Sequence, residues 1–166
     1  MKYTTFEIVI LGMLGAIACV CQVALSFLPN IEVVSILFIV YTKVFGKKAL
    51  FPIYVFVLLE GIFWGFGSWW IMYLYIWAIL WGITMLCRRN DSSTTWAIIN
   101  GAYGLGFGAL CSITQGVMFG IGSGFAYFIS GIPFDIAHCI GNFFTALFLY
   151  KPLTILLSKV RKMLVK

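Results

Sequence analysis

Hydrophobic residues form six long runs along the chain, and short breaks rich in proline, glycine or charged residues separate them. The runs do not alternate with a period of two, so the strands of an outer-membrane barrel are not expected. A helix needs about 20 apolar residues to cross a bilayer, and it satisfies its own backbone hydrogen bonds there. We therefore predict an all-α integral membrane protein with a single domain over residues 1–166, built as a six-transmembrane-helix bundle. The expected spans are about 5–28, 31–45, 49–65, 69–86, 95–121 and 133–158.

The breaks between these runs differ in composition. Pro29 and Asn30 separate the first two spans, and the polar stretch 88–94 separates the fourth span from the fifth. Residues 122–131 are rich in glycine, so we expect them to form the connection before the sixth span. Pro133 then falls at the first position of that helix, where proline is tolerated because an N–H would have no intrahelical partner there.

All 11 lysine and arginine residues fall near the chain ends or in or beside the second and fourth connections. The first, third and fifth connections carry none. Because cytoplasmic loops of membrane proteins are enriched in these residues, we predict cytoplasmic termini and a multi-pass protein of the cell membrane. The basic residues are Lys2, Lys43, Lys47, Lys48, Arg88, Arg89, Lys151, Lys159, Arg161, Lys162 and Lys166.

The composition agrees with a membrane protein and excludes several function classes. The chain is 63% hydrophobic and 10% charged, with a mean hydropathy of +1.06, whereas a soluble domain has about 25% charged residues. The net charge of +6 does not indicate nucleic-acid binding, since the bases are scattered between apolar runs. A single histidine and five cysteines without a CxxC motif indicate no metal site. We expect no metal and no cofactor in this chain.

Three polar residues near the start of the sixth span are candidates for a binding site. Asp135, His138 and Asn142 are spaced i, i+3 and i+7, so they share one helix face. Ionisable residues at membrane depth are functional candidates because their burial is costly. We expect them to line a polar pocket. The alternative is that Asp135 favours the helix N-terminus and that the other two form hydrogen bonds between helices.

Two further acids and a group of aromatic residues lie toward the same outer side of the predicted topology. Glu32 and Glu60 have no base on that side, so they suit a cationic or hydrogen-bond-donating ligand. The alternatives are a helix N-terminal acid for Glu32, and for Glu60 a carboxyl that is protonated or reaches the interface. The aromatic residues line a ligand site or form an interfacial belt. The aromatic candidates are Trp64, Trp69, Trp70, Tyr73, Tyr127 and Phe134.

Small residues in the first span form a broad surface. Gly12, Gly15 and Ala16 would let another helix approach closely. We expect this surface to bind a partner membrane protein, and the alternative is packing within the chain.

Motifs for ATP hydrolysis and for common hydrolases are absent from the sequence. It has no GxxxxGK[ST] phosphate loop, no HExxH and no GxSxG. We therefore expect no catalytic residues and no enzyme activity in this chain. Two alternatives remain, a small membrane enzyme that uses Asp135 and His138 as an acid/base pair, and a stand-alone facilitator or channel.

Several segments resemble a known transporter family. The string from Gly131 to His138 (GIPFDIAH), followed by Gly141-Asn142 and Lys151-Pro152-Leu153, is one of them. The others are residues 28–35 (LPNIEVVS) and 45–48 (FGKK). With six short-looped spans in under 200 residues, the chain resembles the substrate-binding S component of energy-coupling factor (ECF) transporters.

This resemblance implies a function and a set of partners. S components of the prokaryotic plasma membrane capture a vitamin or related micronutrient from outside, and they topple in the bilayer during uptake. They associate with a transmembrane coupling protein and two cytoplasmic ATPases of the ABC type, which hydrolyse ATP. The family docks through an AxxxA motif in its first span, to which Gly12 to Ala16 corresponds as a variant with small residues.

The expected ligand follows from charge and ring content. Seven Trp and Tyr side chains between residues 64 and 81 suit stacking on a flat ring. Acids without an outer base favour a cationic or neutral ligand, so a thiamin-like nitrogen heterocycle fits better than biotin or pantothenate. Backbone amides at a helix N-terminus are an alternative site for an anion.

Overall fold

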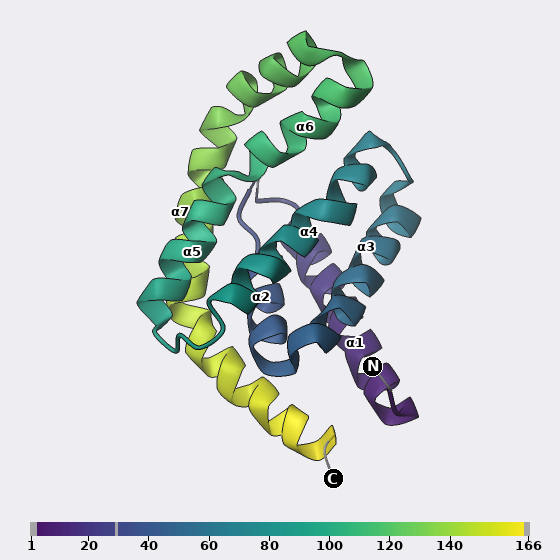
Figure 1. Cartoon of the computed structure of the whole chain (residues 1–166), viewed down its shortest axis with the longest axis vertical. Helices are drawn as coiled ribbons and strands as arrows, with labels where there is room; N and C mark the ends of the chain where they lie inside the picture. The colour runs from purple at the N-terminus through teal and green to yellow at the C-terminus, as the bar shows by residue number, and fades with distance from the viewer. Residues whose placement is uncertain (1–2, 29, 165–166) are drawn as a thin grey trace.

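The computed structural model describes residues 3–28 and 30–164 and is helical almost throughout, with no strand in these ranges. Lys2, Pro29 and Lys166, on which parts of the prediction depend, lie outside the described residues. The all-α prediction is confirmed for the described chain. The elements in order are α1 (Thr5–Ala24), α2 (Val34–Phe45), the 3-10 turn η1 (Gly46–Ala49), α3 (Leu50–Trp64), α4 (Ser68–Leu86), α5 (Ser93–Leu105), α6 (Phe107–Phe119) and α7 (Ile121–Leu164), as Figure 1 shows.

Four helical segments of the described chain are long and apolar enough to cross a membrane. Large apolar side chains on them are exposed, such as Val20 at 67% and Phe148 at 69%, and an apolar surface of this kind suits contact with lipid. These features indicate a membrane protein. At about 1.5 Å per residue, α2 and α3 extend only about 18 and 22 Å, so the six-span count stays a prediction. The four segments are Thr5–Ala24, Ser68–Leu86, Ser93–Phe119 and Ile121–Leu164.

The shortest α-helix, α2, forms the centre of the bundle. All of its residues are buried except Lys43 and Phe45, which are partly buried. It packs against α1, α4 and α7, and its Phe38 makes edge-to-face contacts with Phe56 of α3 and Trp77 of α4 at 5.2 and 5.1 Å between ring centroids. Burial of an apolar helix on every side explains why its sequence shows no polar face.

The C-terminal helix α7 corrects two expectations. It runs without interruption over 44 residues, so residues 122–131 are helical and are not a connection. The turn lies earlier, at Gly120 with φ +94°. A Cβ at Gly124 would lie 2.8 Å from the Cα of Gly116, so glycine in this segment permits close packing of α6 on α7. Pro133 consequently lies inside a helix rather than at its first position.

The expected fifth span divides into two helices. α5 and α6 meet at Gly106, whose φ and ψ of −87° and −3° depart from ideal helix values. α5 lies along α7, and these two form the most extensive helix pair in the described chain. α6 lies between α7 and α4, where the Tyr75 hydroxyl donates to the Leu110 carbonyl at 2.6 Å.

Basic residues and both described chain ends gather at one end of the molecule, opposite the α3–α4 and α6–α7 turns (Figure 1). Here Lys43 pairs with Asp91 at 2.7 Å, and the Arg88 Nε donates to the Lys43 carbonyl at 3.1 Å. Lys48 pairs with Glu7 and so ties η1 to the start of α1. This arrangement agrees with the grouping of bases in the sequence, while the side of the membrane on which this end lies stays a prediction.

Candidate functional site

A cavity of about 340 Å³ lies between α3, α4, α6, α7 and the connection from α1 to α2. Five of the residues expected to bind substrate line it: Glu32, Glu60, Trp64, Tyr73 and His138. They come from four separate parts of the chain, and the fold alone brings them together. The other lining residues are Gln22, Val23, Leu25, Ser26, Leu28, Asn30, Ile31, Trp77 and Phe107.

The two carboxylates and the imidazole of this cavity are almost completely buried, whereas Gln22 and Asn30 are partly buried and Ser26 is exposed. Glu32, Glu60 and His138 are 9%, 3% and 5% exposed. The His138 Nε2 lies 3.4 Å from a carboxylate oxygen of Glu32, and the Ser35 amide donates to the other oxygen at 2.8 Å. Glu32 therefore stabilises the N-terminus of α2, where amides lack intrahelical partners. This confirms the alternative role of Glu32 as a helix N-terminal acid and also places it in the cavity.

Glu60 has a different environment. The Cys19 thiol donates to one of its carboxylate oxygens at 3.4 Å, and no basic side chain pairs with it among the described residues. The cavity-lining residues include no lysine or arginine. A carboxylate so placed favours a positive charge or N–H donors in the cavity, because burial of an unpaired charge is costly.

Aromatic rings form one wall of the cavity. Tyr73 stacks on Phe56 with 17° between the ring planes, and Trp77 meets Tyr73 edge-to-face at 5.4 Å. Phe107, at the start of α6, contacts the ring of His138 at 5.0 Å. Because the rings hold one another in these orientations, they offer a rigid apolar surface to a planar ligand.

A second cavity of about 370 Å³ adjoins the first and shares Asn30 and Phe107 with it. Tyr127, Phe134 and Asp135 line this second cavity. Three more of the expected site residues therefore lie beside the first cavity and not in it. The remaining lining residues are Gly108, Ser130 and Gly131.

Asp135 acts as a cap for another helix. Its carboxylate accepts a hydrogen bond at 3.0 Å from the amide of Gly108, in the first turn of α6. A Cβ at Gly108 would overlap this carboxylate. The expectation that Asp135 stands at the N-terminus of its own helix is wrong because α7 begins at Ile121, but the N-terminus of α6 supplies the same stabilisation.

Asn142 lies away from both cavities, in the interface between α5 and α7. Its side chain is fully buried, and its backbone carbonyl accepts from the Asn100 Nδ2 at 2.9 Å. A Cβ at Gly104 would lie 3.1 Å from its Nδ2. Asn142 lines neither cavity, and its side-chain Oδ1 and Nδ2 have no hydrogen-bond partner in the described chain, so the alternative of a side-chain hydrogen bond between helices is not seen either.

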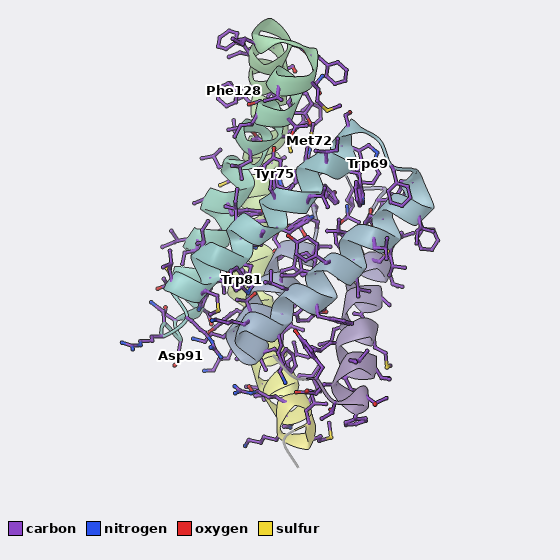
Figure 2. All side chains as sticks on the ribbon, turned by 45° about the vertical axis from the view of Figure 1, so that its right-hand side comes forward. Trp69, Met72, Tyr75, Trp81, Asp91 and Phe128 are labelled. Atoms are coloured by element: carbon purple, nitrogen blue, oxygen red, sulfur yellow. The ribbon has the colours of Figure 1, made fainter. Side chains whose placement is uncertain are left out.

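The tryptophans near the α3–α4 turn have separate roles. Trp64 is 60% exposed at the edge of the first cavity. Trp70 donates its indole N–H to the Val57 carbonyl at 2.8 Å and so joins α4 to α3. Trp69 packs edge-to-face on Tyr73 at 5.4 Å, and Figure 2 shows it beside the α3–α4 turn. Neither Trp69 nor Trp70 lines the two cavities.

Phe107 was not an expected site residue. Trp77 was expected only among the seven Trp and Tyr rings between residues 64 and 81, and Glu32 was the one residue of the α1–α2 connection named individually as a site residue. Trp77 follows Tyr73 by four residues, so helical spacing places the two on one face, and this signal was available in the sequence. Phe107 reaches the cavity only because the chain bends at Gly106. The connection from Leu25 onward covers the cavity through tertiary packing, which no local pattern indicates.

The small residues of α1 do not share one surface. A Cβ at Gly15 would lie 2.7 Å from the Pro52 carbonyl oxygen and from Val55, so Gly15 faces α3 inside the chain. Gly12 has nothing within 4 Å of its Cβ position, and Ala16 is exposed. The expectation of a partner surface is therefore wrong for Gly15, whereas Gly12 and Ala16 form an open face.

No group of three or more metal-ligating side chains is present in residues 3–28 and 30–164. What the first cavity offers is two carboxylates, an imidazole and several rigid rings. Comparisons with protein-family models, with curated proteins and with solved structures each found no match.

Proposed function

We propose that this chain is the substrate-binding S component of an ECF-type ABC importer for a vitamin or related micronutrient. The observation that carries the proposal is the cavity in which the buried side chains of Glu32, Glu60 and His138 lie beside the rings of Tyr73 and Trp77. Small-molecule sites are concave and mostly apolar, with a few convergent polar groups. This cavity has that composition within a bundle of apolar helices.

The size and walls of the cavity favour a compact ligand with a flat aromatic ring. Its volume of about 340 Å³ lies within the range of about 300–1,000 Å³ typical of ligand pockets. Tyr73 and Trp77 meet edge-to-face. This contact holds both rings in fixed orientations, which suits stacking of a planar ligand.

Transport by this chain requires partners. We propose six spans, cytoplasmic termini and a prokaryotic plasma membrane, with a transmembrane coupling protein and two ABC ATPases that supply ATP hydrolysis. The gathering of bases at one end of the molecule supports this orientation. The open face at Gly12 and Ala16 supports docking of a partner helix.

The enzyme alternative has less support from the geometry. An acid/base pair of Asp135 and His138 would need both groups at one reacting atom. Instead, Asp135 bonds to the amide of Gly108, and the closest carboxylate to the His138 ring is Glu32. The channel alternative needs polar groups through the membrane depth, whereas the buried core around Phe38 and Phe56 is mostly apolar, with isolated polar residues such as Ser35 and Thr42.

The proposal is tested by binding measurements on the purified chain in detergent. Trp64 and Trp77 line the cavity, so a bound ring is expected to quench tryptophan fluorescence with saturation at one ligand per chain. A panel of water-soluble vitamins is titrated, with sucrose and glycine as solutes that lack an aromatic ring. Absence of saturable quenching and of calorimetric binding for every vitamin would contradict the proposal.

A further inference from the structure

The two carboxylates of the cavity differ in how many hydrogen-bond donors and positive groups of the protein stabilise their negative charge. The Glu32 carboxylate accepts a hydrogen bond from the Ser35 amide at 2.8 Å, and its other oxygen lies 3.4 Å from the His138 Nε2. Glu60 is 3% exposed, and its hydrogen-bond donor in the described chain is the Cys19 thiol at 3.4 Å. A thiol is a weak donor, so Glu60 is the carboxylate whose charge the protein leaves uncompensated.

An isolated buried carboxylate is costly, and a ligand of opposite charge removes that cost. The walls beside Glu60 strengthen the argument, because Trp64, Tyr73 and Trp77 line the same cavity. Aromatic faces attract cations, most strongly when water is excluded. A positively charged planar group therefore satisfies both the carboxylate and the rings, whereas an anion would face Glu32 and Glu60 with no lysine or arginine among the lining residues.

We propose, on the basis of the proposed function, that the substrate is a cationic nitrogen heterocycle and that Glu60 is its charge anchor. Glu32 and His138 form an internal pair that holds the α1–α2 connection over the cavity. This assignment gives the two acids different roles in the cavity. It also names the one side chain whose charge discriminates between vitamins of different charge.

The test compares ligands and variants by calorimetry on the purified full chain. The probes are thiamin and 1-methylnicotinamide as cations, nicotinamide and pyridoxine as neutral rings, and biotin and pantothenate as anions. We expect a cationic probe to bind the wild-type chain most tightly. Glu60→Gln is expected to weaken that binding by at least about 100-fold, since it removes one partner of a buried charge pair.

Two further variants calibrate the result. Glu32→Gln is expected to weaken binding less than Glu60→Gln, because the Glu32 carboxylate is satisfied within the protein. Glu7→Gln is the matched control, since Glu7 pairs with Lys48 in η1, outside the cavity. It is expected to leave the dissociation constant unchanged. Gel filtration and thermal melting show whether each variant folds, and the comparison of probes on the wild-type chain needs no variant.

The outcomes separate this inference from the proposed function. Tightest binding of an anionic or neutral probe, or unchanged cation binding in Glu60→Gln, overturns the assignment of Glu60 and leaves the proposed function standing. Binding of none of the probes or of other water-soluble vitamins contradicts the proposed function, and the inference falls with it. Tight cation binding that Glu60→Gln abolishes and Glu7→Gln preserves supports both.

Discussion

Single side chains in this protein take their roles from partners that are distant in the sequence. Glu60 meets Cys19 from 41 positions away, and Asp135 meets Gly108 from 27 positions away. The sequence marks such residues because charges in apolar runs are costly, but it does not state which partner each one finds. The difference between a ligand-binding acid and a capping acid is therefore decided by tertiary contacts.

Gly108→Ala tests the cap that the Asp135 carboxylate forms at the N-terminus of α6. The new Cβ would overlap the Asp135 carboxylate, so the hydrogen bond to the α6 amide is expected to be lost. We expect a loss of about 1–3 kcal/mol in stability, the usual effect of leaving a buried polar group unsatisfied. Thermal melting in detergent measures it. Gly12→Ala is the control, since nothing lies within 4 Å of its Cβ position, and equal melting of the two variants would contradict the capping role.

At the scale of elements, hydrophobic runs predict the existence of helices better than their ends. The run at 133–158 is helical, but α7 begins at Ile121 because Gly124 packs on Gly116 rather than forming a turn. A glycine that permits helix contact and a glycine that ends a helix look identical in one sequence. The helix break at Gly106 was not predicted either, because a glycine that ends a helix cannot be told in one sequence from a glycine that permits helix contact.

Only some of the residues of the candidate site could be predicted from the sequence. His138 and Glu60 were identified because polar groups are rare in apolar helices, and both line the cavity. Asn142 carries the same signal, yet it lines neither cavity, and only its backbone carbonyl accepts from Asn100 on α5. Trp77 was expected only as one of seven rings suited to stacking, because composition does not tell a ring that faces a cavity from one that faces lipid.

Gly15→Leu tests the contact between α1 and α3. A side chain there would meet Pro52 and Val55 at 2.7 Å from the Cβ position, so the helices are expected to separate. We expect a loss of about 1–3 kcal/mol or more, typical of overpacking. Melting temperature and gel-filtration profile measure it. A Gly15→Leu chain that melts like wild type would mean that α1 does not pack closely on α3.

Ala16→Leu tests the open face of the same helix. Because Ala16 is exposed, we expect wild-type folding and ligand affinity, with uptake in cells that contain the coupling protein reduced about tenfold or more. Ala126→Leu on α7 is the matched control, as Ala126 is also exposed, and it is expected to transport normally. Normal uptake by Ala16→Leu would exclude this face as the docking surface.

In the molecule as a whole, the described basic residues and chain ends lie at one end, so the two ends of the helix bundle differ in charge (Figure 1). Described bases and termini lie at one end, and the turns after α3 and α6 lie toward the other (Figure 1). Figure 2 shows Phe128 near that second end and Asp91 in the opposite half. The uncharged stretch 107–134 belongs to the second end, so this charge asymmetry, combined with the positive-inside rule, predicts an orientation in the membrane.

Reporter fusions test this orientation. A fluorescent protein fused after the last residue is expected to fluoresce, as it does in the cytoplasm. Alkaline phosphatase fused after Gly120, in the α6–α7 turn, is expected to be active because it requires the oxidising outer side. The reciprocal fusions serve as controls and are expected to be inactive. The reverse pattern would contradict the cytoplasmic placement of the basic end.

We propose that the cavity between α3, α4, α6, α7 and the α1–α2 connection holds a small-molecule nutrient. The most direct measurement is mass spectrometry of the chain purified from its host without added ligand, followed by extraction and identification of bound small molecules. We expect one aromatic nitrogen heterocycle per chain, displaced by the same compound in excess. A chain that carries no small molecule, and that binds none when the vitamin panel is added back, would contradict it.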